Sequence, residues 1–205
     1  MTASLTNMTK LASLCVYCGS AAGDLVDYAN AARALGSHLG RQKIRLVYGG
    51  GNVGLMGIVA TAALDAGGTV IGVIPRALMD KELGLERCTA LHVVENMHER
   101  KKLMADLSDG FIAMPGGIGT LEEFFEAFTW QQLRFHDKPL GLLNTCGFYD
   151  GLLAFLQHAT DAGFLTRAHL ASLRVNAEPE ALMQLLADWT PTHDPKWKAL
   201  RPDAR

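Results

Sequence analysis

No stretch of the sequence approaches the ~20 consecutive apolar residues that a membrane-spanning helix needs. The first ten residues, MTASLTNMTK, contain a single lysine and are not followed by an apolar run that resembles a secretory signal. We therefore expect a cytoplasmic protein that neither enters nor crosses a membrane.

The chain also lacks an excess of charge of either sign. Its 19 Lys and Arg residues nearly balance 21 Asp and Glu, which gives a formal net charge of -2. Such a balance provides no general attraction to nucleic acid or to an anionic membrane surface. Any site for an anion must therefore be local.

Cysteine is scarce. Cys15 and Cys18 form a CxxC pair, but they lie in an apolar run that reads as a buried strand. Residues i and i+3 of a strand point to opposite faces, so this pair is badly placed for a disulfide or a chelate. With no second CxxC in the sequence, we expect free structural thiols and no metal.

The sequence does contain an alternation of short apolar runs and longer amphipathic ones. It predicts strands near residues 12–18, 43–48, 69–74, 109–114 and 138–143, and helices near 24–41, 53–66, 97–107, 120–134, 148–161 and 178–188. Strands that are apolar throughout are typically covered on both faces. We therefore predict the α/β class, as a Rossmann-like, doubly wound, mostly parallel sheet flanked by helices.

The length of 205 residues and the hydrophobic content of 49% suit one core and a single domain. We assign residues 11–189 to this domain, residues 1–10 to an N-terminal extension, and residues 190–205, rich in proline and charge, to a C-terminal tail.

Glycine-rich turns follow three of the predicted strands. They are Cys18-Gly19-Ser20 after the first, Gly49 to Gly54 after the second, and Pro115 to Thr120 after the fourth. The carboxyl ends of parallel strands meet at one edge of a sheet, so these turns should form a single cleft. One such turn could serve tight packing alone, but three together favour phosphate or nucleotide binding.

Two common nucleotide motifs fit poorly. Residues 49–54 match GxGxxG, but the turn follows the second strand, and the third strand ends in Val73-Ile74-Pro75-Arg76 without the acidic residue that binds ribose. No GxxxxGK[ST] motif is present either. The sequence therefore points to a mononucleotide or a sugar phosphate.

The helix before the fourth strand supplies a cation. Asn96 and Glu99 have the spacing of a capping box at its start. Arg100 shares a helical face with apolar residues, whereas Lys102 lies one turn from Asp106. An inward guanidinium needs an anion or hydrogen-bond acceptors, either in a ligand or in a structural ion pair. Lys101 and Lys102, taken alone, read as ordinary surface charges.

The spacing of Thr120 and Glu123 leaves two interpretations open. Thr-x-x-Glu is a capping box, in which Glu123 would accept from the backbone N–H of Thr120. Alternatively, a carboxylate one turn from the glycine cradle could stabilise a developing oxocarbenium ion, or orient a water or a ribose hydroxyl.

Together, these segments resemble a known family. They are CGS at 18–20, LVYGGGNVGLMG at 46–57, GVIP at 72–75, MHERK at 97–101 and PGGIGTLEE at 115–123. They are similar to the "lonely guy" (LOG) family of cytokinin riboside 5'-monophosphate phosphoribohydrolases, often labelled lysine decarboxylases. The resemblance continues through residues 129–133 and 136–139 and covers roughly residues 12–188.

The resemblance implies hydrolysis of the N-glycosidic bond of N6-modified adenosine 5'-monophosphates, with Arg100 and Glu123 as catalytic residues. It implies a homodimer and requires neither cofactor nor metal. The substrate contacts that it implies are Glu82, Arg100, Lys101, Gly117, Ile118, Gly119, Thr120, Leu121, Glu122, Glu123 and Thr129. The glycine turns add Ser20, Gly50 and Gly51 to this set. Ile118 stands where many relatives carry tyrosine, but a backbone cradle does not need that side chain.

Two rival functions remain open. One is a broader nucleosidase that cleaves AMP or pyrimidine 5'-monophosphates. The other is a non-catalytic carrier of a nucleotide or cofactor, which would keep the glycine turns. A carrier would not need both Arg100 and Glu123, so their joint presence favours an enzyme.

Overall fold

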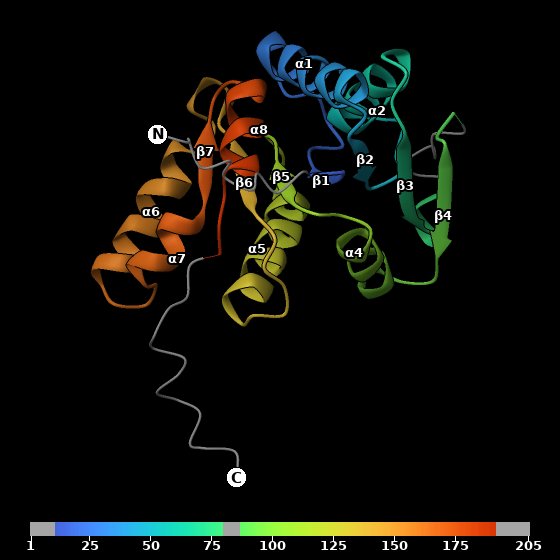
Figure 1. Cartoon of the computed structure of the whole chain (residues 1–205). Coiled ribbons are helices and arrows are strands. Elements are labelled where there is room, and N and C mark those ends of the chain that lie inside the picture. The colour runs from blue at the N-terminus through green and yellow to red at the C-terminus, as the bar shows by residue number, and fades with distance from the viewer. Residues whose placement is uncertain (1–10, 80–86, 192–205) are drawn as a thin grey trace, which may run out of the picture.

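Seven parallel strands form the centre of the molecule in the computed structural model, which describes residues 11–79 and 87–191 (Figure 1). The strands are β1 Ser13–Tyr17, β2 Arg45–Tyr48, β3 Val70–Pro75, β4 Ala90–Val94, β5 Phe111–Ala113, β6 Leu140–Leu143 and β7 Arg174–Asn176. They pair in the order β4-β3-β2-β1-β5-β6-β7, and every neighbouring pair is parallel. The predicted fold class is therefore confirmed.

Helices cover both faces of this sheet (Figure 1). One face packs against α1 Val26–Gln42, α2 Gly54–Asp65 and α8 Pro179–Ala187. The other packs against α4 Met97–Asp106, α5 Ile118–Gln132, α6 Asp150–Asp161 and α7 Arg167–Ser172. Short 3-10 turns η1 Arg76–Leu78 and η2 Thr145–Gly147 follow β3 and β6. No helix in the described ranges is both long and apolar enough to cross a membrane.

The side chains of strand β1 point alternately to the two faces of the sheet, so they contribute to two separate hydrophobic clusters. Leu14, Val16 and Cys18 belong to the cluster under α1, α2 and α8, whereas Cys15 and Tyr17 belong to the cluster under α4, α5 and α6. Successive strand residues point to opposite faces, so Cys15 and Cys18 lie on opposite sides of the sheet. Both are free thiols, as predicted, and burial raises the pKa of each.

The sequence did not predict β4, β7 or α7. Both missed strands lie at the edges of the sheet, where fewer neighbours cover them. β4 is only partly buried and includes the exposed His92, and β7 is a three-residue strand, Arg174–Asn176, with polar ends. Neither therefore carries the continuous apolar run by which the central strands were recognised.

The strand order creates a switch point between β1 and β5. From β1 the chain proceeds through β2, β3 and β4 on one side, then returns to build β5, β6 and β7 on the other. Connections leave β1 and β5 in opposite directions at their carboxyl ends, which opens a crevice where doubly wound proteins bind ligands. The turns after β1 and β5 border this crevice.

Candidate active site

The three glycine-rich turns are hydrogen-bonded to one another. The backbone N–H of Gly19 donates to the carbonyl oxygen of Pro115 (3.1 Å), and the N–H of Leu55 donates to that of Gly19 (3.0 Å). Gly54 has a φ of +56°, and a Cβ there would lie 2.4 Å from the Ser20 carbonyl oxygen. Only glycine fits so close an approach in that conformation. The three turns therefore lie next to one another, with the first turn between the other two.

Helix α5 begins three residues earlier than the capping-box interpretation requires. Its N-cap is Gly117, in an extended conformation, and Thr120 is already the third helical residue. Thr120 is therefore not a helix cap, and Glu123 lies in the second turn, where it has no cap to complete. This excludes the capping box at Thr120 that the spacing left open.

The start of α5 can accept an anion. The first N–H groups of a helix have no intrahelical acceptor, and Gly117 has no side chain to cap them. Gly117, Ile118 and Gly119 are exposed, so these groups are open to a ligand. The helix dipole adds partial positive charge, as at many phosphate sites.

A cavity of about 270 Å³ lies beside this helix start. Ser20 and Gly117 line it together with Tyr28 and Phe148, whose rings meet edge to face at 5.8 Å. The sequence argument missed both aromatic residues. Phe148 could have been found because it follows β6, whose carboxyl end lies at the same edge of the sheet as the glycine turns.

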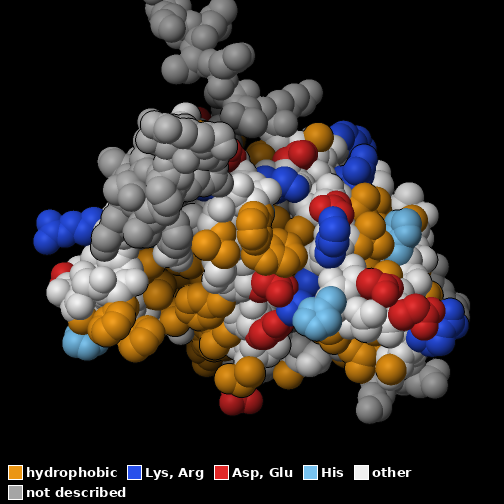
Figure 2. All heavy atoms as spheres, turned by 90° about the horizontal axis from the view of Figure 1, so that it is seen from below, with side chains coloured by type: hydrophobic (Ala, Val, Ile, Leu, Met, Phe, Trp, Pro, Cys, Tyr) orange, Lys and Arg blue, Asp and Glu red, His pale blue; other side chains and the backbone are white. Residues whose placement is uncertain are grey.

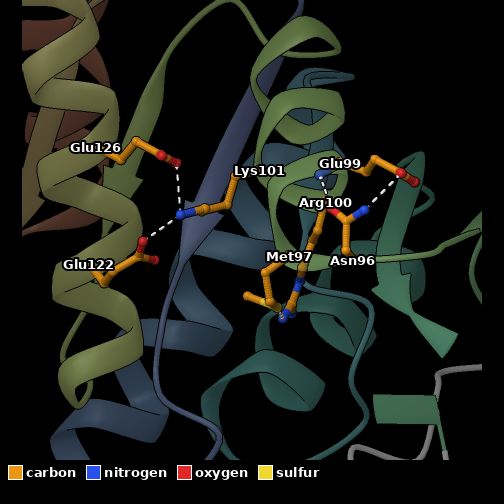
Figure 3. Close-up of polar contacts among 7 residues, drawn as sticks. All are labelled: Asn96, Met97, Glu99, Arg100, Lys101, Glu122 and Glu126. Carbon is orange, nitrogen blue, oxygen red and sulfur yellow. Dashed lines mark hydrogen bonds and ion pairs between the residues drawn. The ribbon is translucent and has the colours of Figure 1, made fainter. Parts of the chain in front are cut away.

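Arg100 is held by the ends of two strands. Its side chain is buried, with 4% of the residue exposed, as the helical periodicity predicted. Nη2 donates to the carbonyl oxygen of Gly49 (2.8 Å) and Nε to that of Val73 (3.2 Å). The Met97 sulfur lies 3.8 Å from Nη1 (Figure 3). A Cβ at Gly49 would lie 2.1 Å from Nη2, so a larger residue there would displace the guanidinium.

The predicted cap of α4 is also present. Asn96 is the N-cap, and its Oδ1 accepts from the N–H of Glu99 (2.9 Å). The Glu99 carboxylate accepts in return from the N–H of Glu95 (3.1 Å) and from the Asn96 side chain (2.9 Å). The cap fixes the first turn of the helix that carries Arg100.

The charges of Glu123 and Arg100 both influence the pKa of a residue in strand β1. Burial is the main cause of the raised pKa of Cys15, and the charge of Glu123 adds to it while that of Arg100 opposes it. Burial and then the Cys15 thiol raise the pKa of Tyr17, followed by Glu123. The predicted catalytic pair therefore lies beside the carboxyl half of β1, from which the first glycine turn emerges.

Lys101 is not the ordinary surface charge that it resembles when taken alone, and its role as a substrate contact stays a prediction. It is 6% exposed, and its ammonium contacts the carboxylates of Glu122 and of Glu126, the latter at 3.0 Å (Figure 3). Burial lowers its pKa, but the two carboxylates outweigh this effect and the net pKa is raised. Lys102, by contrast, pairs with Asp106 at 2.6 Å on the surface, as predicted.

The remaining predicted contacts are spread out. Gly50 and Gly51 are buried after β2, and Leu121 is half-buried in the first turn of α5. Thr129 is exposed nine residues beyond Thr120, which places it about 13 Å further along the helix axis. Glu82 lies outside the described residues. The structure thus brings together Ser20, Gly117 and the start of α5, but not Thr129.

Comparison with known sequences identifies the family of this chain. A family model described as "Possible lysine decarboxylase" matches residues 56–186. The cytokinin riboside 5'-monophosphate phosphoribohydrolase LOG1 of Arabidopsis thaliana is 46% identical over 188 residues, which cover 91% of this chain and 87% of that one. The chain belongs to the LOG family. A rice relative, the probable phosphoribohydrolase LOGL6 of Oryza sativa subsp. japonica, is 44% identical over 186 residues, 91% of this chain and 74% of its own.

Solved structures share the fold of this LOG-family chain. The molybdenum cofactor carrier protein of Chlamydomonas reinhardtii superposes with a TM-score of 0.62 at 25% identity, over 86% of this chain and 98% of its own. The molybdenum cofactor binding protein of Rippkaea orientalis gives 0.61 at 23% identity, over 84% and 92%. The sheet and its helices therefore serve more than one kind of protein.

Proposed function

We propose that this LOG-family chain hydrolyses the N-glycosidic bond of N6-modified adenosine 5'-monophosphates, the riboside monophosphates of cytokinins. The products are the free base, an active cytokinin, and ribose 5-phosphate. The observation that carries the proposal is the meeting of an open helix start, a buried arginine and a carboxylate at one edge of the sheet, in a chain 46% identical to a named phosphoribohydrolase.

The start of α5 binds the 5'-phosphate in this proposal. The first N–H groups of α5 are free of intrahelical acceptors at a start where residues 117–119 are exposed, and the adjoining cavity lies between Ser20 and Gly117. Gly50 and Gly51 bring the second turn to the same edge. The exposed Ile118 side chain is not needed for these backbone contacts.

Glu123 and Arg100 then act on the ribose. As the bond from C1' to the base breaks, positive charge develops on the sugar, and an ionised carboxylate stabilises it. Water adds to C1', and the base leaves with a proton. Arg100, fixed by two backbone carbonyls, binds a substrate oxygen and orders the cleft. Glu82, Leu121, Glu122 and Thr129 remain predicted contacts from the family resemblance.

A lysine decarboxylase finds little support among the described lysines. Such an enzyme uses pyridoxal phosphate, which forms a Schiff base with a neutral lysine amine. Lys101 is held charged by two carboxylates, Lys102 pairs with Asp106, and Lys43 and Lys138 donate to the carbonyl oxygens of Gly67 and Ala105.

We further propose a cytoplasmic homodimer whose catalytic domain spans residues 11–189. The free state of the described cysteines suits a reducing compartment. Figure 2 shows hydrophobic side chains gathered among charged ones on one face of the molecule. Ile118, the first residue of α5, is 82% exposed, and Phe135, three residues beyond the end of α5, is 73% exposed. Exposed apolar groups of this size are frequent at interfaces between subunits.

The decisive experiment incubates purified protein with isopentenyladenosine 5'-monophosphate, AMP, CMP and the unphosphorylated isopentenyl riboside, and measures released base. We expect release from the isopentenyl nucleotide and little from the riboside, because the riboside cannot use the start of α5. Equal release from AMP or CMP would instead indicate a broader nucleosidase. No release from any substrate would contradict an enzymatic function and favour a carrier.

A further inference from the structure

Lys101 joins the two helices that carry the proposed catalytic pair. On α4 it directly follows Arg100, and its partner Glu122 on α5 directly precedes Glu123. The lysine side chain is 7% exposed, and its ammonium contacts Glu122 and Glu126, with the Glu126 distance at 3.0 Å. One ammonium therefore binds one turn of the neighbouring helix at two points.

Arg100 and Lys101 point in different directions. Successive helical residues are turned by about 100°, since a turn contains about 3.6 residues. Figure 3 shows the Lys101 side chain directed at α5 while Arg100 extends toward the Met97 side chain at the edge of the sheet. The ammonium of Lys101 is thus engaged by protein carboxylates rather than presented beside the guanidinium.

The next residue, Lys102, also forms an ion pair, and a comparison of the two pairs shows how that of Lys101 differs. Lys102 pairs with Asp106 of its own helix, and the side chains are 72% and 58% exposed. An exposed pair within one helix contributes little and links nothing else. Lys101 is buried and spans two helices. Its partners are more open, with side chains 51% exposed for Glu122 and 27% for Glu126, so the contribution to net stability is small and the main effect is to join the two helices at a defined place.

The same ammonium balances the acidic turn around Glu123. Glu123 and Glu126 are three residues apart, so they share a helical face, and both charges act on Tyr17. The other groups in this environment are Cys15 of β1 and Cys18 directly after β1, on which Glu123 also acts, and Arg100 of α4, which acts on Cys15. A cation at Glu126 offsets repulsion between the two carboxylates and favours the ionised form of Glu123.

We propose that Lys101 is a positioning residue, which with Glu122 and Glu126 clamps α4 to α5 and so fixes Arg100 relative to Glu123. The inference rests on the proposed hydrolase function and adds to it. In this role Lys101 acts through the two catalytic residues, in addition to the substrate contacts that the family resemblance implies for Lys101 and Glu122.

The test compares Lys101→Met, which removes the charge, with Lys101→Arg, which keeps it, and with the matched control Lys102→Met. We expect Lys101→Met to lower kcat about ten- to a hundredfold with KM changed by less than about twofold, because the reacting groups are misplaced while phosphate binding persists. The acidic limb of its kcat profile should move to higher pH, since Glu123 loses a nearby cation. Lys101→Arg should recover most of kcat, and Lys102→Met should match the wild type.

A second readout does not depend on turnover. Backbone hydrogen exchange in α4 and α5 should be faster in Lys101→Met than in Lys102→Met, because one clamp is lost. If the wild type cleaves no substrate, the proposed function fails while faster exchange still supports the clamp. A higher KM with unchanged kcat, or unchanged kinetics and exchange, would overturn the clamp. Glu126→Gln provides the same tests should Lys101→Met not fold.

Discussion

At the scale of single residues, the site depends on close contacts between the Arg100 side chain and backbone carbonyl groups. The periodicity of α4 predicted that Arg100 points inward. It could not predict acceptors at Gly49 and Val73, because a backbone carbonyl has no sequence signature of its own. Lys101 was misread for a related reason. Its burial depends on carboxylates of α5, about twenty residues further along the chain, and not on the pattern of its own helix.

Gly49→Ala should disable the site through Arg100. The added Cβ would lie 2.1 Å from Nη2 and 3.2 Å from Cζ, so the guanidinium must move. We expect kcat/KM to fall by roughly a hundredfold, and the free energy of unfolding to fall by about 1–3 kcal/mol from overpacking. Steady-state kinetics and urea unfolding measure both effects.

Gly151→Ala provides the matched control for that change. A Cβ at Gly151, in α6, would meet no atom within 4 Å. This variant should keep full activity and gain about 0.5–1 kcal/mol, because alanine is the better helix former. Wild-type turnover in Gly49→Ala would show that the position of Arg100 does not matter.

At the scale of elements, apolar runs identified the strands that are covered on both faces. β1, β2, β3, β5 and β6 were predicted within a few residues of their observed positions, whereas the edge strands were missed. The start of α5 was also placed too late. Glycine is a poor helix former, so Gly119 favoured a start at Thr120. In the fold, packing of the turn after β5 onto Gly19 overrides that preference, and the helix begins at Ile118.

The early start of α5 changes the interpretation of Glu123. Glu123 lies in the second turn, so its carboxylate completes no cap at Thr120 and can face β1. Spacing alone could not distinguish the two roles, because a capping box and a catalytic carboxylate share one pattern. The position of the N-cap excludes the capping box, and the catalytic role of Glu123 stays a prediction.

At the scale of the whole molecule, the sequence indicated which edge would hold the ligand but not which strands are neighbours. The switch point between β1 and β5 follows from strand order, which depends on how helices on both faces pack. The packing also buries groups far from the site, and one of them should control stability in acid.

His136 should make the fold sensitive to acid. Burial, and then the charge of Lys138, lowers its pKa to about 4, against the effects of the Ala127 carbonyl and Asp137. Its Nδ1 accepts from the N–H of Lys138 (3.2 Å), a bond that protonation removes. Because the folded pKa lies below the ordinary value of about 6.5, the stabilisation is present above pH ~6.5 and is lost as pH falls through ~4.

Urea unfolding between about pH 7 and pH 4.5 measures this effect. His136→Gln should lose about 1–2 kcal/mol less stability than the wild type across that interval, since glutamine does not titrate and each unit of pKa corresponds to about 1.4 kcal/mol. The exposed His158→Gln serves as control and should follow the wild type. Parallel losses in all three proteins would show that His136 does not set the acid response.

The central claim is that this chain breaks an N-glycosidic bond with Glu123 facing the sugar. The most direct measurement quantifies free base and ribose 5-phosphate released from isopentenyladenosine 5'-monophosphate by the wild type and by Glu123→Gln. Glutamine keeps the size of the side chain and removes its charge, and no helix cap is lost because α5 begins at Ile118. We predict equal amounts of both products from the wild type and a loss of about a thousandfold in turnover in the variant, with its fold unchanged. Undiminished turnover in Glu123→Gln, or no free base from the wild type, would contradict the account.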